Sequence, residues 1–221
     1  MAGGTLYSLV LIIPLAYALS KKYLFGRSQV TWFFLFTMYF GGGLVPSYLL
    51  IKNLGLINNP LVMIIGGISV FNMVITRTFF QTSIPEELYE AAKIDGASEY
   101  ACFFKIALPL SGAIIAVMAL YQAVAIWNSY FNALLYLTNS RYFPLQIILR
   151  NILIMNEQMA MDMESFMNLD IQAQEIIIHK QRMAQTMKYS LVFIASAPLL
   201  AAYPFVQKYF VKGVMIGSLK G

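Results

Sequence analysis

Charged residues, cysteine and histidine are scarce in this 221-residue sequence. Charged residues make up only 11% of the chain and hydrophobic residues 59%, a balance outside the range of soluble globular domains. The single cysteine, Cys102, excludes an internal disulfide and a cysteine-based metal cluster. The only histidine, His179, has no ligand partner in the sequence around it. We therefore expect an all-α integral membrane protein with no metal site and no catalytic residues.

Two further classes of function are excluded. No GxxxxGK(S/T) loop is present, so we do not expect this chain to bind and hydrolyse ATP or to hold a cofactor of its own. The net charge of +5 would suit nucleic acid, but the cations are scattered at the ends of apolar runs and form no stripe. Cations placed in this way indicate how the chain is oriented in the membrane lipid. We therefore do not expect nucleic acid as a partner.

Five apolar runs are long enough to cross a membrane. The first has no cation before it, and Lys21, Lys22 and Arg27 follow it directly. A cleavable signal peptide has the opposite arrangement, so we expect a retained span. The second run contains three successive glycines and Pro46, so we expect a kinked span. The predicted spans are Thr5–Leu19, Thr31–Ile51, Pro60–Phe80, Pro109–Leu137 and Ser190–Tyr209.

The distribution of cations predicts the topology. With the N-terminus outside and five spans, nine of the fifteen Lys and Arg residues fall on the inner face. Five of the six outer ones lie in residues 138–188, where we expect an external loop with helices at Leu145–Met155 and Ile171–Met187. Charges in a long loop weigh little in setting orientation, and the sixth, Lys52, lies in a predicted turn. The inner cations are Lys21, Lys22, Arg27, Arg77, Lys93, Lys105, Lys208, Lys212 and Lys220.

The stretch Ser83–Pro109, which we call the knob, holds five of the ten acidic residues and lies between two predicted spans. It must lie in water, because charges are expensive in hydrocarbon. Ser83 and Glu86 have the spacing of a capping box, and the proline between them suits a first helical turn, so a helix is predicted to begin here. Gly96 is predicted to end it, and a second short helix is predicted to begin near Ser98.

The knob resembles the EAA loop of permease subunits in bacterial binding-protein-dependent ABC importers. The match is gapless: Glu90-Ala91-Ala92, three residues, Gly96, nine residues, then Ile106-Ala107-Leu108-Pro109. In that family the loop is the coupling helix that seats in a cleft of the cytoplasmic ATPase subunit. The resemblance implies that the small residues at Ala91 and Ala92 fit this cleft. The residues to which it assigns coupling are Glu87, Glu90, Ala91, Ala92, Asp95, Gly96, Ile106 and Pro109.

The resemblance covers nearly the whole chain and implies one domain, residues 1–221, with the type I ABC importer permease fold. It implies a location in a bacterial cell membrane. The implied partners are two ABC ATPase subunits, which use the ATP, a second permease subunit and an extracellular solute-binding lipoprotein. Permeases of this branch usually begin with one more membrane helix, so we expect the present sequence to lack an N-terminal part.

The terminal VKGVMIGSLKG is similar to the carbohydrate branch of these permeases, particularly to aldouronate and complex-polysaccharide importers. This likeness implies a sugar or an oligosaccharide as the substrate. An importer for an amino acid, a peptide or a metal would share the knob, whereas a non-transport membrane scaffold would not need it. Both alternatives stay open at this point.

The segment WNSYFN within the fourth run combines aromatic and amide side chains. On a continuous helix Trp127, Tyr130 and Phe131 share one face, while Asn128 and Asn132 lie on the adjoining face. Aromatic rings and amides suit a sugar, which has apolar ring faces and hydroxyl edges. Membrane helices also use both residue types for packing, so a substrate pathway and a packing role both remain open.

Overall fold

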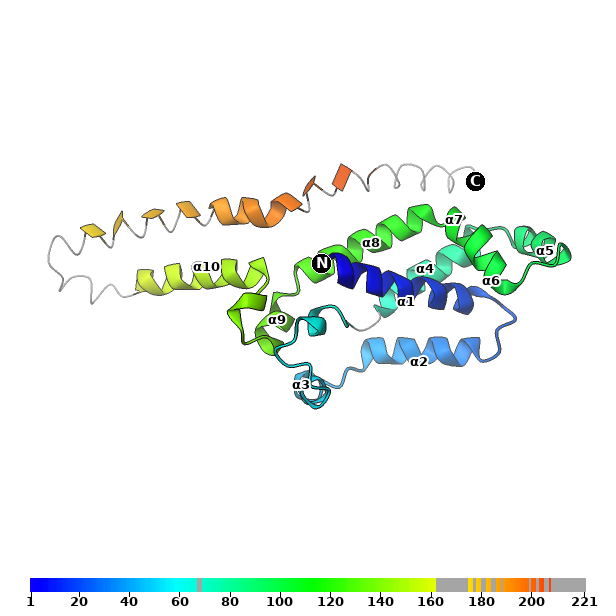
Figure 1. Cartoon of the computed structure of the whole chain (residues 1–221), viewed down its shortest axis with the longest axis horizontal. Coiled ribbons are helices and arrows are strands. Elements are labelled where there is room, and N and C mark those ends of the chain that lie inside the picture. Colours follow the sequence, from blue (N-terminus) through cyan, green and yellow to red (C-terminus); the bar gives the residue numbers. More distant parts are fainter. Residues whose placement is uncertain are drawn as a thin grey trace. The chain divides into compact units, whose positions relative to one another are not determined.

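The computed structural model describes residues 1–66 and 69–161, and between residues 175 and 207 it describes 175–176, 178–179, 182–183, 186–187, 189–198, 200–201, 203–204 and 207. All elements assigned within these residues are helical, which confirms the all-α prediction (Figure 1). In chain order they are α1 (Ala2–Ser20), α2 (Arg27–Tyr39), α3 (Leu44–Asn53), the 3₁₀ helix η1 (Pro60–Met63), α4 (Val70–Thr82), α5 (Glu86–Ile94), α6 (Glu99–Ala101), the π-helix η2 (Cys102–Ala107), α7 (Leu108–Leu110), α8 (Gly112–Trp127), α9 (Tyr130–Tyr136), the 3₁₀ helix η3 (Ser140–Tyr142) and α10 (Leu145–Met161).

The chain divides into two units, Met1–Trp127 together with Pro204–Gly221, and Asn128–Tyr203. In the first unit α1 packs against α4 and α8. Within the described residues α1 is the single helix long and apolar enough to cross a membrane unaided. It confirms that the first apolar run forms one helix, with Pro14 inside it. The half of α1 that follows this proline carries much of the buried core, at Ala16, Tyr17 and Leu19.

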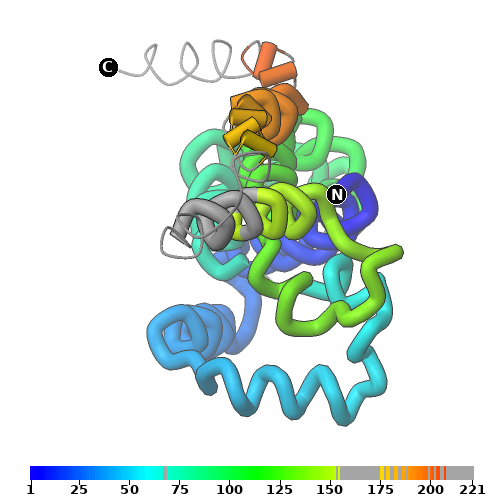
Figure 2. Tube along the Cα trace, turned by 90° about the vertical axis from the view of Figure 1, so that its left-hand side faces the viewer, coloured from blue at the N-terminus to red at the C-terminus, as the bar shows by residue number. Residues whose placement is uncertain are grey.

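The second apolar run bends, as predicted, but it forms two helices separated by a break and not one continuous helix. Residues 40–43 are not helical, and α2 and α3 meet at an angle of 112°. Figure 1 shows α2 lengthwise and α3 end-on, and Figure 2 shows the reverse. Gly43, the N-cap of α3, has a φ of 85° and a ψ of 178°, a backbone conformation that is essentially restricted to glycine. The three successive glycines therefore lie at the sharp bend between α2 and α3.

The third and fourth predicted spans are also shorter as helices than their apolar runs. The helix of the third begins only at Val70, and Pro60–Met63 forms a 3₁₀ turn that Asn59 caps by accepting a hydrogen bond from the Leu61 N–H at 3.0 Å. In the fourth run α8 ends at Trp127, and α9 begins at Tyr130. Apolar composition thus identified the runs but not where each helix begins and ends.

The second unit contains α9 packed against α10, with Ala133, Tyr136, Ile147 and Leu149 buried. The predicted helix at Leu145–Met155 is confirmed, and it extends to Met161. Parts of the predicted helix Ile171–Met187 and of the last predicted span, Ser190–Tyr209, lie outside the described residues, as do the terminal residues 211–221. The count of five spans therefore stays a prediction, although Tyr189–Pro198 is an apolar helix.

Candidate functional site

The first helix of the knob, α5, ends at a Schellman turn built on Gly96. The Gly96 N–H donates to the Lys93 carbonyl at 3.0 Å, and the Ala97 N–H donates to the Ala92 carbonyl at 2.9 Å. These two bonds satisfy carbonyls that the end of a helix leaves unpaired, and they need a residue with positive φ between them. Gly96 has a φ of 78°. The predicted helix stop is confirmed.

The predicted capping box at the start of α5 was wrong. Ser83 is the C-cap of α4, where its N–H donates to the Phe79 carbonyl at 2.9 Å, and it does not cap α5. The N-cap of α5 is Pro85, without a side-chain cap. Instead, the negative charges of Glu86 and Glu87 in the first turn stabilise α5 by interacting with the positive end of its helix dipole.

The second helix of the knob begins as predicted, at Ser98, whose hydroxyl oxygen accepts a hydrogen bond from the Ala101 N–H at 3.3 Å. After three residues it widens into the π-helix η2, a feature that the sequence did not indicate. The helix then runs through Pro109 and bends by 77° into α8 at Ser111, whose buried hydroxyl donates to the Ala107 carbonyl at 2.6 Å. This bend joins the knob to the membrane part of the chain.

Helix α5 has two opposite sides. Its inner side contains Tyr89, which is buried, and Ala92, which is half-buried against the core cluster of the first unit. Its outer side, one helical face by spacing, is exposed and consists of Glu87, Glu90, Ala91 and Ile94. Ile94 is 86% exposed, although it is one of the larger apolar residues of the chain.

The residues predicted to couple to an ATPase therefore fall into two groups, one packed against the core of the chain and one exposed to solvent. Ala92 and Ile106 pack against the core of the chain, whereas Ala91 is exposed. Successive helical residues lie about 100° apart, which separates these two alanines. The predicted residues that are exposed are Glu87, Glu90, Ala91, Asp95, Gly96 and Pro109.

An aromatic cluster joins the knob to α1 and α4. The ring of Tyr17, on α1, lies 5.5 Å from that of Phe80, 6.1 Å from that of Tyr89 and 4.9 Å from that of Phe103 between centroids. These distances are typical of aromatic contacts. Burial raises the pKa of Tyr89 to about 12. Cys102, fully buried beside the cluster, is a packing residue.

The charged residues around the base of the knob make contacts beyond the membrane orientation that their sequence positions indicate. Lys21 lies with its Nζ 2.9 Å from the centroid of the Tyr89 ring, and burial lowers the pKa of Lys21 to about 8. Burial acts to raise the pKa of Glu99, but hydrogen bonds from Lys93 and Tyr23 outweigh it and hold that pKa below its usual range. These contacts, which no local sequence pattern reveals, join residues 21–23 to the knob.

The aromatic and amide segment does not form the helical face that was predicted for it. Asn128 and Ser129 interrupt the helix, so the assignment of Trp127, Tyr130 and Phe131 to one face was wrong. Trp127 is half-buried and ends the first unit, whereas Asn128, Tyr130 and Asn132 are exposed in the second unit. Within the described residues, no group of three or more His, Cys, Asp or Glu side chains is placed to hold a metal ion.

Comparison with known proteins identifies the family. Residues 5–216 match the model of the binding-protein-dependent transport system inner membrane component family. Protein LplC of Bacillus subtilis (strain 168) is 42% identical over 219 residues, which are 99% of this chain and 70% of that protein. The polygalacturonan/rhamnogalacturonan transport system permease protein YtcP of the same organism is also 42% identical over 219 residues, covering 99% of this chain and 73% of YtcP.

A solved structure has the same fold. A chain in the crystal structure of a bacterial ABC transporter involved in the import of the acidic polysaccharide alginate superposes with a TM-score of 0.78 and is 30% identical, covering 95% of this chain and 71% of that chain. The matched family model, the near-complete coverage by relatives and this superposition agree. The chain belongs to the family of binding-protein-dependent transport system inner membrane components, the permease subunits of ABC importers.

Proposed function

We propose that the chain forms half of the pathway by which an ATP-driven importer moves an oligosaccharide or a fragment of a polysaccharide into a bacterial cell. The chain is a multi-pass inner-membrane permease, and ATP is hydrolysed by a separate subunit. The observation that carries the proposed substrate class is the 42% identity, over 99% of the chain, to a polygalacturonan/rhamnogalacturonan permease. The similarity to a chain of an alginate importer supports the same class.

Transport of labelled sugar tests this substrate class. The permease pair and its ATPase, reconstituted in vesicles with the extracellular binding protein, should take up a labelled oligogalacturonate when ATP is supplied. Labelled amino acids and peptides should not enter. Uptake of an amino acid or a peptide in place of the sugar would favour the alternative importer class, and the absence of any ATP-driven uptake would favour a scaffold.

The outer side of α5 is the proposed contact with the ATPase. It combines two carboxylates, the small Ala91 and the exposed Ile94 on one face, and Gly96 follows directly. An exposed large apolar residue between charged ones suits a protein interface. We assign the partners as two ABC ATPase subunits, a second permease subunit and an extracellular solute-binding lipoprotein.

The positions of the cations support a cytoplasmic knob. Lys22 forms an ion pair with Glu86 of α5, and Arg77 on α4 donates to the carbonyl of Leu19 at the end of α1. The ends of α1 and α4 and the knob therefore gather cations that the sequence assigned to the inner face. This grouping is the arrangement that the positive-inside rule favours.

A bulky residue on the outer side of α5 tests the docking surface. Ala91→Trp should reduce co-purification with the ATPase, because overfilling a packed contact costs roughly 1–3 kcal/mol, or a factor of about five to one hundred and fifty in binding. The matched control is Ala2→Trp, since Ala2 is exposed at the opposite end of α1 from the knob. Wild-type co-purification by Ala91→Trp would remove the docking assignment.

The proposed substrate pathway includes Trp127, Asn128, Tyr130 and Asn132. The break between α8 and α9 leaves the amides of Asn128 and Asn132 exposed within their own unit, where they are able to bind hydroxyl groups or water. Asn132→Leu should abolish sugar uptake while the variant still assembles with the ATPase. Loss of assembly would instead support the packing role, and normal uptake would exclude Asn132 from the pathway.

A further inference from the structure

The three residues after α1 contact both helices of the knob, and we call residues 21–23 the clip. The Lys21 Nζ lies over the ring of Tyr89 on α5 and 4.7 Å from the centroid of the Tyr17 ring. Lys22 forms an ion pair of 3.0 Å with Glu86, also on α5. Tyr23 donates a hydrogen bond from its hydroxyl to a carboxylate oxygen of Glu99 on α6. Three consecutive residues thus reach both sides of the turn at Gly96.

The contacts of the clip differ in strength. The side chains of Lys22 and Glu86 are 77% and 61% exposed, so their ion pair contributes little. Lys21 is half-buried between aromatic rings, where a cation is attracted more strongly. The Glu99 carboxylate accepts from Tyr23 and also pairs with Lys93 at 2.8 Å, and the Lys93 Nζ lies 4.1 Å from the centroid of the Tyr23 ring. Within the clip, Lys21 is thus the half-buried contact, and Tyr23, although 57% exposed, binds a carboxylate that Lys93 also holds.

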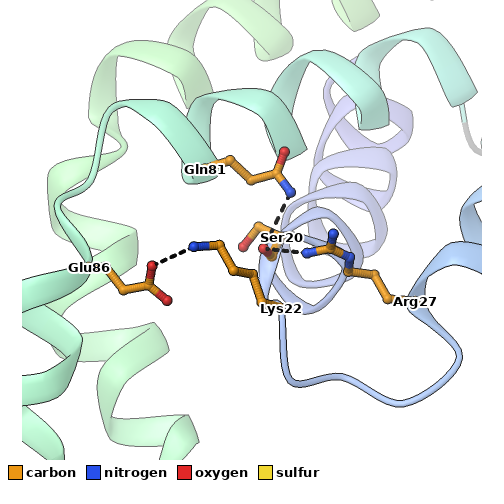
Figure 3. A network of polar contacts seen from close by, with 5 residues as sticks. All are labelled: Ser20, Lys22, Arg27, Gln81 and Glu86. Carbon is orange, nitrogen blue, oxygen red and sulfur yellow. Dashed lines mark hydrogen bonds and ion pairs between the residues drawn. The ribbon is translucent and has the colours of Figure 1, made fainter.

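The end of α1 is also fixed to α4. Gln81 donates to the Ser20 carbonyl at 3.4 Å, and Arg27 donates to the same carbonyl at 3.5 Å. Figure 3 shows these two bonds beside the ion pair of Lys22 with Glu86. These two donors satisfy one carbonyl that the helix itself cannot pair. The last turn of α1 is consequently bound to the helix before the knob and, through the clip, to the knob itself.

The covalent connections of α5 are less constrained. Residues 83–85 between α4 and α5 are not helical, and α5 is joined to α6 through the turn at Gly96. A force on the outer side of α5 would turn the helix about these two connections if side chains did not hold it. Among the described residues, the clip and the aromatic cluster provide contacts between α5 and α1.

We propose that Lys21 and Tyr23 are positioning residues that transmit displacement of the knob to α1, and so determine how much transport accompanies each ATP hydrolysed. This proposal rests on the proposed function of the knob as the ATPase contact. Its mechanism is a rigid link between two elements that would otherwise move independently, and coupling of this kind requires contiguous packed contacts.

The first test compares transport with hydrolysis in the complete importer. The double variant Lys21→Met, Tyr23→Phe keeps most of the packing volume and removes the charge and the hydroxyl. It should co-purify with the ATPase and hydrolyse ATP, but import about fivefold less labelled oligogalacturonate per ATP, the lower limit for typical coupling between sites. The single variant Lys21→Arg keeps the positive charge, so it should import as much oligogalacturonate per ATP as the wild type. The control is Lys52→Met, since Lys52 is exposed at the end of α3.

The outcomes separate this proposal from the proposed function. If Ala91→Trp loses the ATPase while the double variant transports with the wild-type ratio, the role of the clip is wrong and the docking surface stands. If Ala91→Trp retains the ATPase, the docking surface itself is wrong.

A second measurement does not depend on the sugar or on the folding of the double variant. Spin labels at Phe25→Cys and Tyr100→Cys, both highly exposed, report the distance between the α1–α2 connection and α6, while the native Cys102 is fully buried. With the clip intact this distance should be the same with and without ATP. A change on addition of ATP would show that the clip opens during the cycle and would overturn the proposal.

Discussion

The two sides of α5 face different requirements. The inner side is packed by Tyr89 and half-buried Ala92 against a helix of the same chain, whereas the outer side presents Glu87, Glu90, Ala91 and Ile94 to solvent. We therefore expect a residue on the inner side to affect the stability of the permease, and a residue on the outer side to affect the proposed contact with the ATPase. Adjacent residues of one short helix separate these two roles, so substitutions at neighbouring positions test them independently.

The largest contrast is expected between two apolar residues of α5. Tyr89→Ala should lower the free energy of unfolding by about 3–5 kcal/mol, because it removes a buried aromatic ring and leaves a cavity. Ile94→Ala should change it by less than about 0.5 kcal/mol, since Ile94 is 86% exposed. Thermal unfolding of the purified permease in detergent measures both. Equal losses would mean that the two sides of α5 do not differ in packing.

The neighbouring alanines give a second contrast with one kind of substitution. Ala92→Trp should lower the free energy of unfolding by roughly 1–3 kcal/mol, because it overfills a packed contact. Ala91→Trp should leave the unfolding temperature at the wild-type value while binding of the ATPase weakens. Unfolding and co-purification measured on the same preparations decide this. If Ala91→Trp were the less stable of the two, the assignment of inner and outer sides would be reversed.

The pH dependence of stability tests the burial of Lys21 at the inner side. Its pKa is lowered from 10.5 to about 8, mainly by burial, while the Glu99 carboxylate opposes the shift. Between pH 8 and 10.5 the unfolded chain then binds the proton that the folded chain has released, so stability rises with pH in this window. The titratable groups that face Lys21 are Tyr17, Glu86, Tyr89, Lys93, Glu99 and Cys102.

Unfolding temperatures measured across this window should therefore rise for the wild type relative to Lys21→Met, which cannot titrate at this position. The comparison removes the contributions of the surrounding groups, since both proteins contain them. A constant difference between pH 8 and 10.5 would mean that Lys21 keeps its ordinary pKa and is not buried at the base of the knob.

The features that the sequence predicted correctly are those that depend on a few adjacent residues. Gly96 ends α5 and Ser98 caps the next helix because each acts on backbone groups within four positions. The same kind of reasoning failed at Ser83, because α4 extends to that residue and uses it as a C-cap. Where two helices compete for one residue, the local pattern does not decide between them.

Helix breaks and distant contacts were not predictable from the sequence. Glycines and asparagines are tolerated within membrane helices when neighbours satisfy the backbone, so Gly43 and Asn128 were compatible with both a continuous and a broken helix. The clip joins residues separated by 64 and 76 positions, and no periodicity spans such a distance. The fold and the two helices of the knob were therefore predictable from the sequence, but the link between the knob and α1 was not.

The smallest effect is expected from removing single hydroxyl groups at the inner side. Among the described residues the Tyr89 hydroxyl, like that of Tyr17, is buried and has no hydrogen-bond partner. Burying an unpaired polar group costs free energy, so Tyr89→Phe should change stability by less than about 0.5 kcal/mol or increase it slightly. The substitution changes no charge at neutral pH, because burial raises the pKa of Tyr89 to about 12. Tyr23→Phe is the comparison, since it breaks the bond to Glu99 and should destabilise the protein more. A loss of about 1 kcal/mol or more in Tyr89→Phe would mean that this hydroxyl has a hydrogen-bond partner in the folded permease, and the ring alone would then not account for the attachment of α5 to α1.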